Sequence, residues 1–283
     1  GAVLAYQRTH TLTDTRKLTL DWIRTNVKPR SVIASGPFMI RIPEDVYLTL
    51  PMPFNAGASE QTFAFYNTVW YEDADIVITS DYDYARYVAD PGRFRAILPF
   101  YDSLKTRWRK VFEIAPQEDQ AGYTFRLYAP PPGTTADAFD PTAVGRLKIA
   151  PAGYSVPFMG KLGLILSTRQ KNIKAAQLFG AVLDLEPANQ SAQRALALCY
   201  FQAGDYERAL SLSEAYLNIH PADPELLGAS GSALLDLGRV EEAREHLSAA
   251  VERGSRAPMD YVNLALIHIS DGELKKAHGV LTL

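Results

Sequence analysis

Residues 190–223 read QSAQRALALCYFQAGDYERALSLSEAYLNIHPAD, and this pattern decides the fold of the second half of the chain. The pattern returns every 34 residues between positions 156 and 283. Two sets of small residues share that interval: Gly204, Gly238 and Gly272, and Ala175, Ala209, Ala243 and Ala277. A fixed period of this length is typical of a solenoid in which similar helical units stack on one another.

Each repeat has the residues that a helix, a tight turn and a second helix require. Gly204 can end the first helix, because glycine adopts the left-handed cap conformation at little cost. Ala209 falls where the two helices cross, and its small side chain lets their axes approach closely. Pro221 prevents the second helix from continuing. Since every helix pair leaves an apolar face bare, neighbouring pairs must stack to bury it.

This stretch resembles the tetratricopeptide repeat, a helix–turn–helix unit of 34 residues. Four units follow from the register, over residues 156–189, 190–223, 224–257 and 258–283, the last of which stops within its second helix. In the second unit, Leu196, Ala197 and Tyr200 match the first-helix signature of the family, and Ala209 and Pro221 match its second helix and closing proline. The resemblance therefore implies an all-helical tetratricopeptide superhelix.

Two positions depart from the repeat. Gln170 stands where the turn glycine is expected, a mild departure because the first repeat of an array is often atypical. Ser255 occupies the position that Pro187 and Pro221 hold in the earlier units. We expect both units to form helix pairs nonetheless.

In the tetratricopeptide family the first helices line a groove that receives a protein or peptide, and the resemblance implies the same use here. The register places these residues on that face: Arg194, Leu198, Phe201, Gln202, Ser232, Leu235, Asp236, Asn263, Leu266 and Ile269. The lining is mostly neutral and apolar, and it lacks the Lys and Asn ring that clamps acidic peptide tails in chaperone-binding members. A helix or an extended segment of a partner suits such a groove. Alternatively, the chain's own linker or first domain fills it.

Residues 1–129 alternate strand-like and helix-like patterns, which predicts a small α/β domain with a partly parallel sheet. Helices are expected over about 15–27, 60–70, 81–88 and 92–105, and strands over about 31–35, 46–50, 75–80, 109–114 and 123–128. The last two strands should form a hairpin, because only a polar loop separates them. The proline-rich stretch over residues 130–155 is expected to be a semi-extended linker.

The run DTRKLTLDWIRTNVKPRSVIA (residues 14–34) resembles a segment of polytopic glycosyltransferases that use lipid-linked sugars. These are of the dolichyl-phosphate-mannose–protein mannosyltransferase and aminoarabinose transferase type, in which the segment follows the last membrane helix. Shorter motifs within residues 74–128 fit the same family: ADIVITS, YARY, FYDSL, VFEIAP and FRLY. The resemblance implies a non-catalytic accessory region on the extracytoplasmic side (periplasmic or cell-surface) of a membrane transferase, whose membrane part is a further partner. We then expect membrane helices upstream of Gly1, with this chain as a piece of a longer protein.

Two other hypotheses stay open. The chain can be a free-standing repeat adaptor with an unrelated α/β domain, and then a cytoplasmic location is the alternative. It can also be a soluble metal-dependent enzyme that transfers sugars and uses Asp81 and Asp83. Hydropathy upstream of Gly1 separates the first two readings, and bound metal with turnover would identify the third.

The pair Asp81 and Asp83 directly follows a predicted strand, where two carboxylates could hold a divalent cation against a diphosphate. The alternative is structural: Asp81 caps the next helix and Asp83 lies in its first turn, where the helix dipole favours acids. Tyr84 and Arg86 would extend a carbohydrate surface, with ordinary packing as the alternative. A second acidic group over residues 72–75 is expected to be a solvated turn.

Several classes of function are disfavoured by composition. The net charge is −3 and neither half is strongly basic, so we expect no nucleic-acid partner. No apolar run approaches the roughly 18 residues of a membrane span. The single Cys199 lies in an apolar helical pattern and is expected in the core. The five histidines show no metal-ligand spacing, and no glycine-rich phosphate loop occurs. We therefore expect no catalytic residue, metal or cofactor in this chain.

Overall fold

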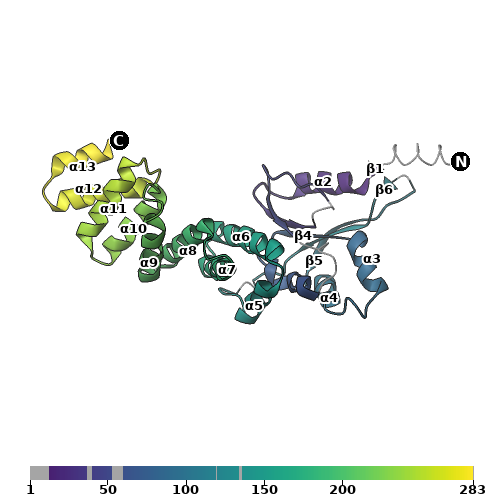
Figure 1. The fold of residues 1–283 in the computed structure, drawn as a ribbon. Coiled ribbons are helices and arrows are strands. Elements are labelled where there is room, and N and C mark those ends of the chain that lie inside the picture. The colour runs from purple at the N-terminus through teal and green to yellow at the C-terminus, as the bar shows by residue number, and fades with distance from the viewer. Residues whose placement is uncertain (1–12, 37–39, 53–59, 119, 134–135, 283) are drawn as a thin grey trace. The chain divides into compact units, whose positions relative to one another are not determined.

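The computed structural model describes residues 13–36, 40–52, 60–118, 120–133 and 136–282 (Figure 1). The chain divides into two compact units, Gly1–Ile165 and Leu166–Leu283. The first contains a partly parallel sheet and the second is helical, so the predicted fold class is confirmed. Within the described ranges, no helix is both long and apolar enough to cross a membrane.

The sheet of the first unit has five strands in the order β3-β2-β4-β7-β5. Their bounds are Val32–Ser35 (β2), Leu48–Pro51 (β3), Ile76–Ser80 (β4), Arg109–Ile114 (β5) and Phe125–Ala129 (β7). β2 runs parallel to β3 and β4, whereas β7 runs antiparallel to β4 and β5. All five residues of β4 are buried, which explains the apolar run from Ile76 to Ile78 at its start. The predicted antiparallel pairing of the last two strands is confirmed.

A short second sheet joins β1 (Thr13–Asp14) to β6 (Gln120–Ala121) in parallel. Asp14 then begins α2 (Thr15–Asn26), because its side chain accepts a hydrogen bond of 2.8 Å from the Arg16 amide. Ile23 is fully buried on the inner face of this helix. The predicted helix over residues 15–27 is confirmed.

Two other predicted helices differ from the structure. The stretch over residues 60–70 forms two 3₁₀ segments, η1 (Glu60–Phe65) and η2 (Thr68–Trp70). Asn67 separates them, because its side chain accepts from the Val69 amide and caps the second segment. The helix expected from about residue 92 begins later, as α4 (Leu98–Arg107), with Pro99 in its first turn. α3 (Asp81–Ala89) lies close to its predicted place.

The stretch over residues 130–155, expected to be a semi-extended linker, contains a helix. α5 (Pro141–Ile149) begins at Asp140, whose carboxylate accepts a hydrogen bond of 2.8 Å from the Thr142 amide. Proline near the start of α5 costs nothing, because the first amides of a helix have no intrahelical partner. Leu147 is fully buried. α6 (Ala152–Thr168) begins at the end of this stretch, so the proline-rich composition marks helix starts here.

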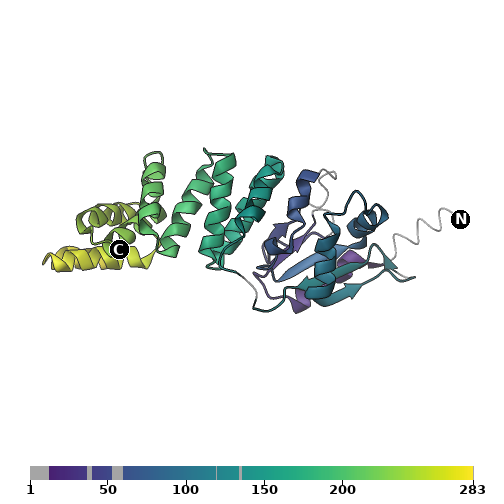
Figure 2. The same ribbon diagram turned by 90° about the horizontal axis from the view of Figure 1, so that it is seen from below.

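The second unit consists of paired helices whose bounds fall within the predicted 34-residue frames (Figure 2). They are α7 (Asn172–Leu185), α8 (Gln190–Ala203), α9 (Tyr206–Leu217), α10 (Pro224–Asp236), α11 (Val240–Glu252), α12 (Pro258–Ser270) and α13 (Leu274–Leu281). The periodic alanines are all buried: Ala175, Ala209, Ala243 and Ala277. Cys199 is buried as predicted, and burial raises the pKa of its thiol to about 11.

The turns between paired helices depend on a residue with positive φ. Gly204, Gly238 and Gly272 have φ of 78°, 73° and 76°. Gln170, in the turn between α6 and α7, has φ of 60°, a conformation that residues other than glycine disfavour. The interpretation of Gln170 as a substituted turn glycine is therefore confirmed.

Candidate functional site

The predicted groove residues lie on α8, α10 and α12, the first helices of their pairs. Equivalent positions along these helices form three rows: Arg194–Gly228–Val262, Leu198–Ser232–Leu266 and Phe201–Leu235–Ile269. We call this surface the first-helix face. Side chains in one row share a repeat position, yet their surroundings differ strongly from helix to helix.

On α8, the apolar members of the face are mainly packing residues. Leu198 and Phe201 are half-buried and pack against a cluster that includes Leu226 and Leu227 of α10. Phe201 also packs against a second cluster, around Leu234. These contacts join successive repeats, so substituting Phe201 would disturb stability as well as any bound partner.

The α10 part of the face is more polar. Leu235 is half-buried against the second cluster, whereas Asp236 is exposed, as is Gln202 of α8. The Asp236 carboxylate is bonded to the Tyr206 hydroxyl and raises the pKa of that phenol. This region therefore offers a carboxylate and an amide to solvent.

Arg194 forms an ion-pair network that links α8 to the start of α10. Its Nε donates to Oδ2 of Asp223 over 2.5 Å, and its Nη2 donates to Oε2 of Glu225 over 2.5 Å. These bonds raise the pKa of Arg194. Burial disfavours the ionised form of Asp223, but hydrogen bonds from Arg194 and the Leu226 amide outweigh that effect and lower its pKa. The guanidinium of Arg194 is thus engaged within the protein.

α12 carries an apolar surface exposed to solvent, unlike the other two helices. Met259, Val262, Leu266 and Ile269 are 60%, 39%, 56% and 48% exposed. Their spacing of three, four and three residues places them on one side of the helix. Leu264 and Ile267, on the other side, are buried in the core. We call the four exposed residues the α12 stripe.

The repeat register predicts Leu266 and Ile269 on this face but not Met259 and Val262, the other two members of the stripe. Met259 and Val262 occupy the positions of Glu225 and Gly228 in the preceding repeat. Comparison with that repeat therefore does not predict an apolar side chain at either position. Their spacing from Leu266 was the available signal. Asn263 borders the stripe and donates a hydrogen bond of 3.1 Å to Ser232 of α10.

Asp260 anchors the inner side of α12 beneath the stripe. Its buried carboxylate accepts a hydrogen bond of 2.5 Å from the Ser255 hydroxyl, and burial raises its pKa. A Cβ atom at Gly228 would overlap this carboxylate. Ser255, which replaces the closing proline, also accepts a hydrogen bond from the Ala257 amide at the start of α12. The replacement therefore positions α12 through side-chain hydrogen bonds.

Asp81 is held by an ion pair on the first unit. Its Oδ1 accepts a hydrogen bond of 2.5 Å from Arg126, whose Nε also donates to Glu113 over 2.8 Å. Ser80 occupies the cap position of α3 and Asp81 is its first residue, which corrects the prediction that Asp81 caps the helix. The side chain of Asp83 lies outside the described residues. No group of His, Cys, Asp and Glu side chains with metal-binding geometry occurs among the residues described.

Tyr84 and Arg86 make packing contacts on the same helix. The Tyr84 hydroxyl accepts a hydrogen bond from Lys105, and its ring lies 5.0 Å from that of Tyr101. The Arg86 guanidinium lies 5.9 Å from the centre of the Phe94 ring. These contacts do not gather the two side chains around Asp81.

The acidic group over residues 72–75 was expected to be a solvated turn, which is wrong. Asp73 is buried, and Oδ2 of Asp75 accepts a hydrogen bond of 2.7 Å from the Val32 amide at the start of β2. A carboxylate that accepts from a strand amide fixes the chain where the neighbouring strands β2 and β4 begin. This group is therefore part of the framework of the first unit.

Comparison with known proteins places two family matches in the repeat region. Residues 169–250 match a family model described as anaphase-promoting complex, cyclosome, subunit 3. Residues 229–280 match a model of the tetratricopeptide repeat. The chain thus contains tetratricopeptide repeats. Both matches lie outside residues 14–128, so the glycosyltransferase resemblance stays a prediction.

No curated protein sequence matches this chain. Among solved structures, similar chains include several of MamA. A MamA structure from AMB-1 is 21% identical with a TM-score of 0.40, and covers 50% of this chain and 84% of its own. Another crystal structure of MamA is 14% identical with a TM-score of 0.43, covering 50% and 83%. MamA from Desulfovibrio magneticus RS-1, from residue 41 to its end, is 22% identical with a TM-score of 0.42, covering 50% and 81%.

Proposed function

We propose that the tetratricopeptide repeats bind a segment of a partner protein across the first-helix face, with the α12 stripe as the principal contact. The observation that carries the proposal is the alignment of four exposed apolar side chains on α12. Exposed apolar area of this kind is worth roughly 25 cal/mol for each Å² that a partner removes from water. The proposed function is therefore that of a protein-interaction scaffold without catalysis in the repeats.

The shape and charge of the face favour an amphipathic helix as the ligand. The stripe extends from Met259 to Ile269, which is about 15 Å along a helix axis. A partner helix presents apolar anchors at a similar spacing when it lies in a groove. The neighbouring polar groups, Asp236 and the Glu225 carboxylate, are acidic, although Glu225 is paired with Arg194. A partner with basic residues beside its apolar anchors complements this arrangement.

Site-specific photo-crosslinking tests the proposal. A photoreactive amino acid at Leu266 in the full-length protein should crosslink to a defined partner in its native host. The same amino acid at Glu245, an exposed position of the second helix α11, provides the control. The double substitution L266D/I269D should then abolish binding of the purified partner while leaving the fold intact. Equal crosslinking from both positions, or unchanged binding by the double variant, would contradict the proposal.

A second proposal assigns the first unit to a membrane glycosyltransferase as an extracytoplasmic accessory region. The supporting observation is that residues 14–34 form α2 and β2, while the motifs in residues 74–128 contribute to β4, β7 and β5. The resembling residues thus build four of the five strands of the main sheet. In this setting the repeats would recruit a protein partner or an acceptor to the transferase.

Hydropathy of the full-length reading frame upstream of Gly1 distinguishes the two settings. A series of membrane spans there, with an acidic residue in the first outer loop, would support the transferase setting and the extracytoplasmic location. A start without such spans would exclude that setting and leave a free-standing adaptor. Partner binding by the α12 stripe is testable in either case.

A further inference from the structure

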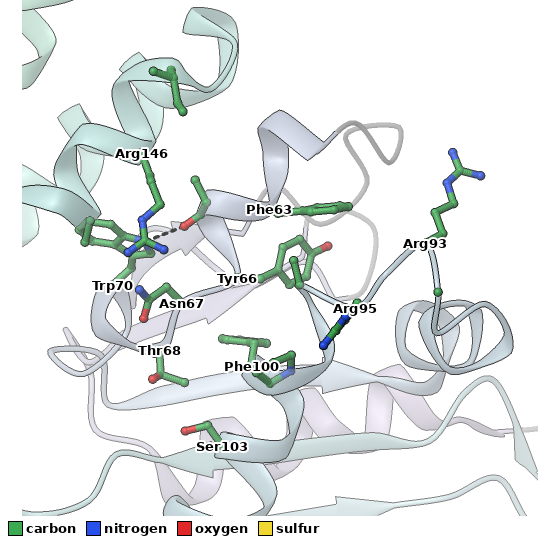
Figure 3. Close-up of a pocket in the computed structure, with 16 residues that line it drawn as sticks. Phe63, Tyr66, Asn67, Thr68, Trp70, Arg93, Arg95, Phe100, Ser103 and Arg146 are labelled. Atoms are coloured by element: carbon green, nitrogen blue, oxygen red, sulfur yellow. Dashed lines mark hydrogen bonds between the residues drawn. The ribbon is translucent and has the colours of Figure 1, made fainter.

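The first unit contains a cavity of about 600 Å³ that the protein-binding function does not use. It opens between the η1–η2 segment, the loop before α4 and helix α5 (Figure 3). Cavities of roughly 300–1,000 Å³ are the usual size for small-molecule sites. The chemistry of the lining therefore decides which molecule fits.

The described part of the lining carries positive charge. Arg93, Arg95 and Arg146 contribute to it, and no Asp or Glu occurs among the lining residues that the structure describes. In the part of the chain that the structure describes, none of the three forms an ion pair with a carboxylate. Arg146 is near enough to Asp140 to help lower the pKa of that exposed acid, while its own Nε donates weakly to the Thr142 carbonyl over 3.4 Å. Such a wall attracts an anion.

Two of the arginines face the cavity from different elements. Figure 3 shows Arg146 of α5 above Trp70 and Asn67, while Arg95 lies beside Tyr66 and Phe100. Arg93 points away from both. Two guanidinium groups on separate elements can serve different oxygens of one oxyanion, and guanidinium is the side chain best matched to phosphate.

The floor of the cavity is aromatic and held in place by internal hydrogen bonds. Trp70 Nε1 donates to the Ala64 carbonyl over 2.9 Å, and the Tyr66 and Tyr87 hydroxyl groups are bonded over 2.6 Å. Phe100 packs edge-to-face against Tyr66 at 5.8 Å. Tyr66, Trp70 and Phe100 are only 6%, 1% and 2% exposed, so they form a fixed wall behind the cavity, and the half-buried Phe63 offers aromatic surface to a ligand ring.

Donors also border the floor. The Asn67 Oδ1 atom accepts from the Val69 amide over 3.2 Å, which leaves its Nδ2 group to donate. The buried Ser103 hydroxyl has no hydrogen-bond partner among the described residues.

We propose that this cavity binds a small ligand in which a phosphate group is attached to a sugar or nucleoside ring. Arg95 and Arg146 bind the phosphate, and the ring lies against Phe63, the half-buried aromatic side chain of the lining. A phosphate fits better than a carboxylate, because it offers three oxygens to guanidinium groups that approach from separate sides. This site stands independently of protein binding by the repeats.

Isothermal titration calorimetry with the purified full chain tests the proposal. The probes are glucose 1-phosphate, uridine monophosphate, inorganic phosphate, glucose and uridine. At least one phosphorylated ring compound should bind ten or more times more tightly than its unphosphorylated counterpart, and binding should weaken with salt. Preference for glucose 1-phosphate or for uridine monophosphate tells which ring the site accepts. Binding of inorganic phosphate alone, or of no probe at millimolar concentration, would overturn the proposal.

Three variants assign the binding to this cavity. R95Q and R146Q should each weaken binding of the phosphorylated ligand about tenfold or more, since a charged hydrogen-bond donor is lost. Arg107→Gln is the matched control, because Arg107 is an exposed arginine of α4 outside the lining. All three arginines are exposed, so thermal unfolding should be unchanged. If R95Q and R146Q bind as R107Q does, the phosphate is bound elsewhere and the proposal fails.

Discussion

Arg194 of α8 donates a hydrogen bond of 2.5 Å to Asp223, the residue that caps α10. Asp223 is the last residue of one repeat and caps the first helix of the next. Its carboxylate also accepts a hydrogen bond from an arginine of the preceding first helix. Only 12% of the Asp223 side chain and 31% of the Arg194 side chain are exposed, so the pair is partly shielded from solvent. The contact connects neighbouring repeats across the first-helix face.

Replacing Arg194 with Gln should lower the free energy of unfolding by about 1–2 kcal/mol, because a shielded charge-assisted hydrogen bond is lost. Urea denaturation measures the change. Arg208→Gln is the control, since Arg208 forms an exposed pair with Asp205 within the same turn of helix. Exposed pairs contribute less than about 0.5 kcal/mol in helices. Equal losses in the two variants would show that the Arg194 network does not join the repeats.

Titration with acid should show that Asp223 and Asp260 change the stability of the folded protein in opposite directions. The pKa of Asp223 is lowered in the folded protein, so its stabilisation is present above the unfolded value of 3.8 and is lost as pH falls through the folded pKa. The pKa of Asp260 is raised, so the folded state binds the proton more tightly and stability falls as pH rises from 3.8 through the folded pKa.

D260N should therefore remove a decrease in stability that the unmodified protein shows as pH rises above 3.8. R194Q should instead differ most from the unmodified protein near neutral pH and converge with it in acid. Unfolding free energies at a series of pH values separate the two effects. Identical pH profiles for D260N and the unmodified protein would mean that Asp260 titrates as an exposed acid does.

Gln170→Gly should stabilise the protein by about 0.5–1 kcal/mol, because residue 170 has a left-handed backbone that glycine adopts freely. Gly204→Gln, at the equivalent turn with φ of 78°, should destabilise it by a similar amount or more. Thermal unfolding of both variants gives the comparison. A loss of stability in Q170G would indicate that the Gln170 side chain makes a contribution larger than the strain.

The local features of the repeats could be predicted from sequence, since each depends on residues adjacent in the chain. Gly204 and Gln170 occupy their turn because the 34-residue register is strict, and Ala209 is buried for the same reason. Exposure along the first-helix face could not be predicted in this way. Leu198 and Leu266 share a repeat position, but Leu198 packs against α10, whereas the side chain of Leu266 is exposed.

The cavity was missed because its lining is dispersed in sequence. Phe63 and Arg146 lie far apart in the chain, and the sequence predicts a semi-extended linker where α5 forms. The composition of residues 130–155 does not distinguish a helix from a linker, because proline is compatible both with the first turn of a helix and with an extended chain. Only the packing of α5 near η1 brings the arginine to the aromatic floor. Motifs with fixed spacing cannot reveal a site of this kind.

Gly228→Ala should destabilise the repeats by about 1–3 kcal/mol, because the added methyl group overlaps the Asp260 carboxylate and forces α10 and α12 apart. Gly180→Ala in α7 is the matched control. A Cβ atom there meets no other atom within 4 Å, and alanine favours the helix over glycine by about 0.8–1 kcal/mol. Opposite signs of the two changes in urea denaturation support the close approach. A G228A variant stabilised as much as G180A would mean that Asp260 moves aside at no cost.

Alanine substitutions on the two sides of α12 test whether the stripe is free in the isolated protein. Leu264→Ala should cost about 2–5 kcal/mol, because Leu264 is buried in the core and its removal leaves a cavity. Leu266→Ala should change the free energy of unfolding by less than about 0.5 kcal/mol, since its side chain already faces solvent. The same L266A variant should weaken binding of a partner helix, which would separate recognition from folding. A large stability loss in L266A would show that another part of the protein covers the stripe, and the partner would then have to bind elsewhere.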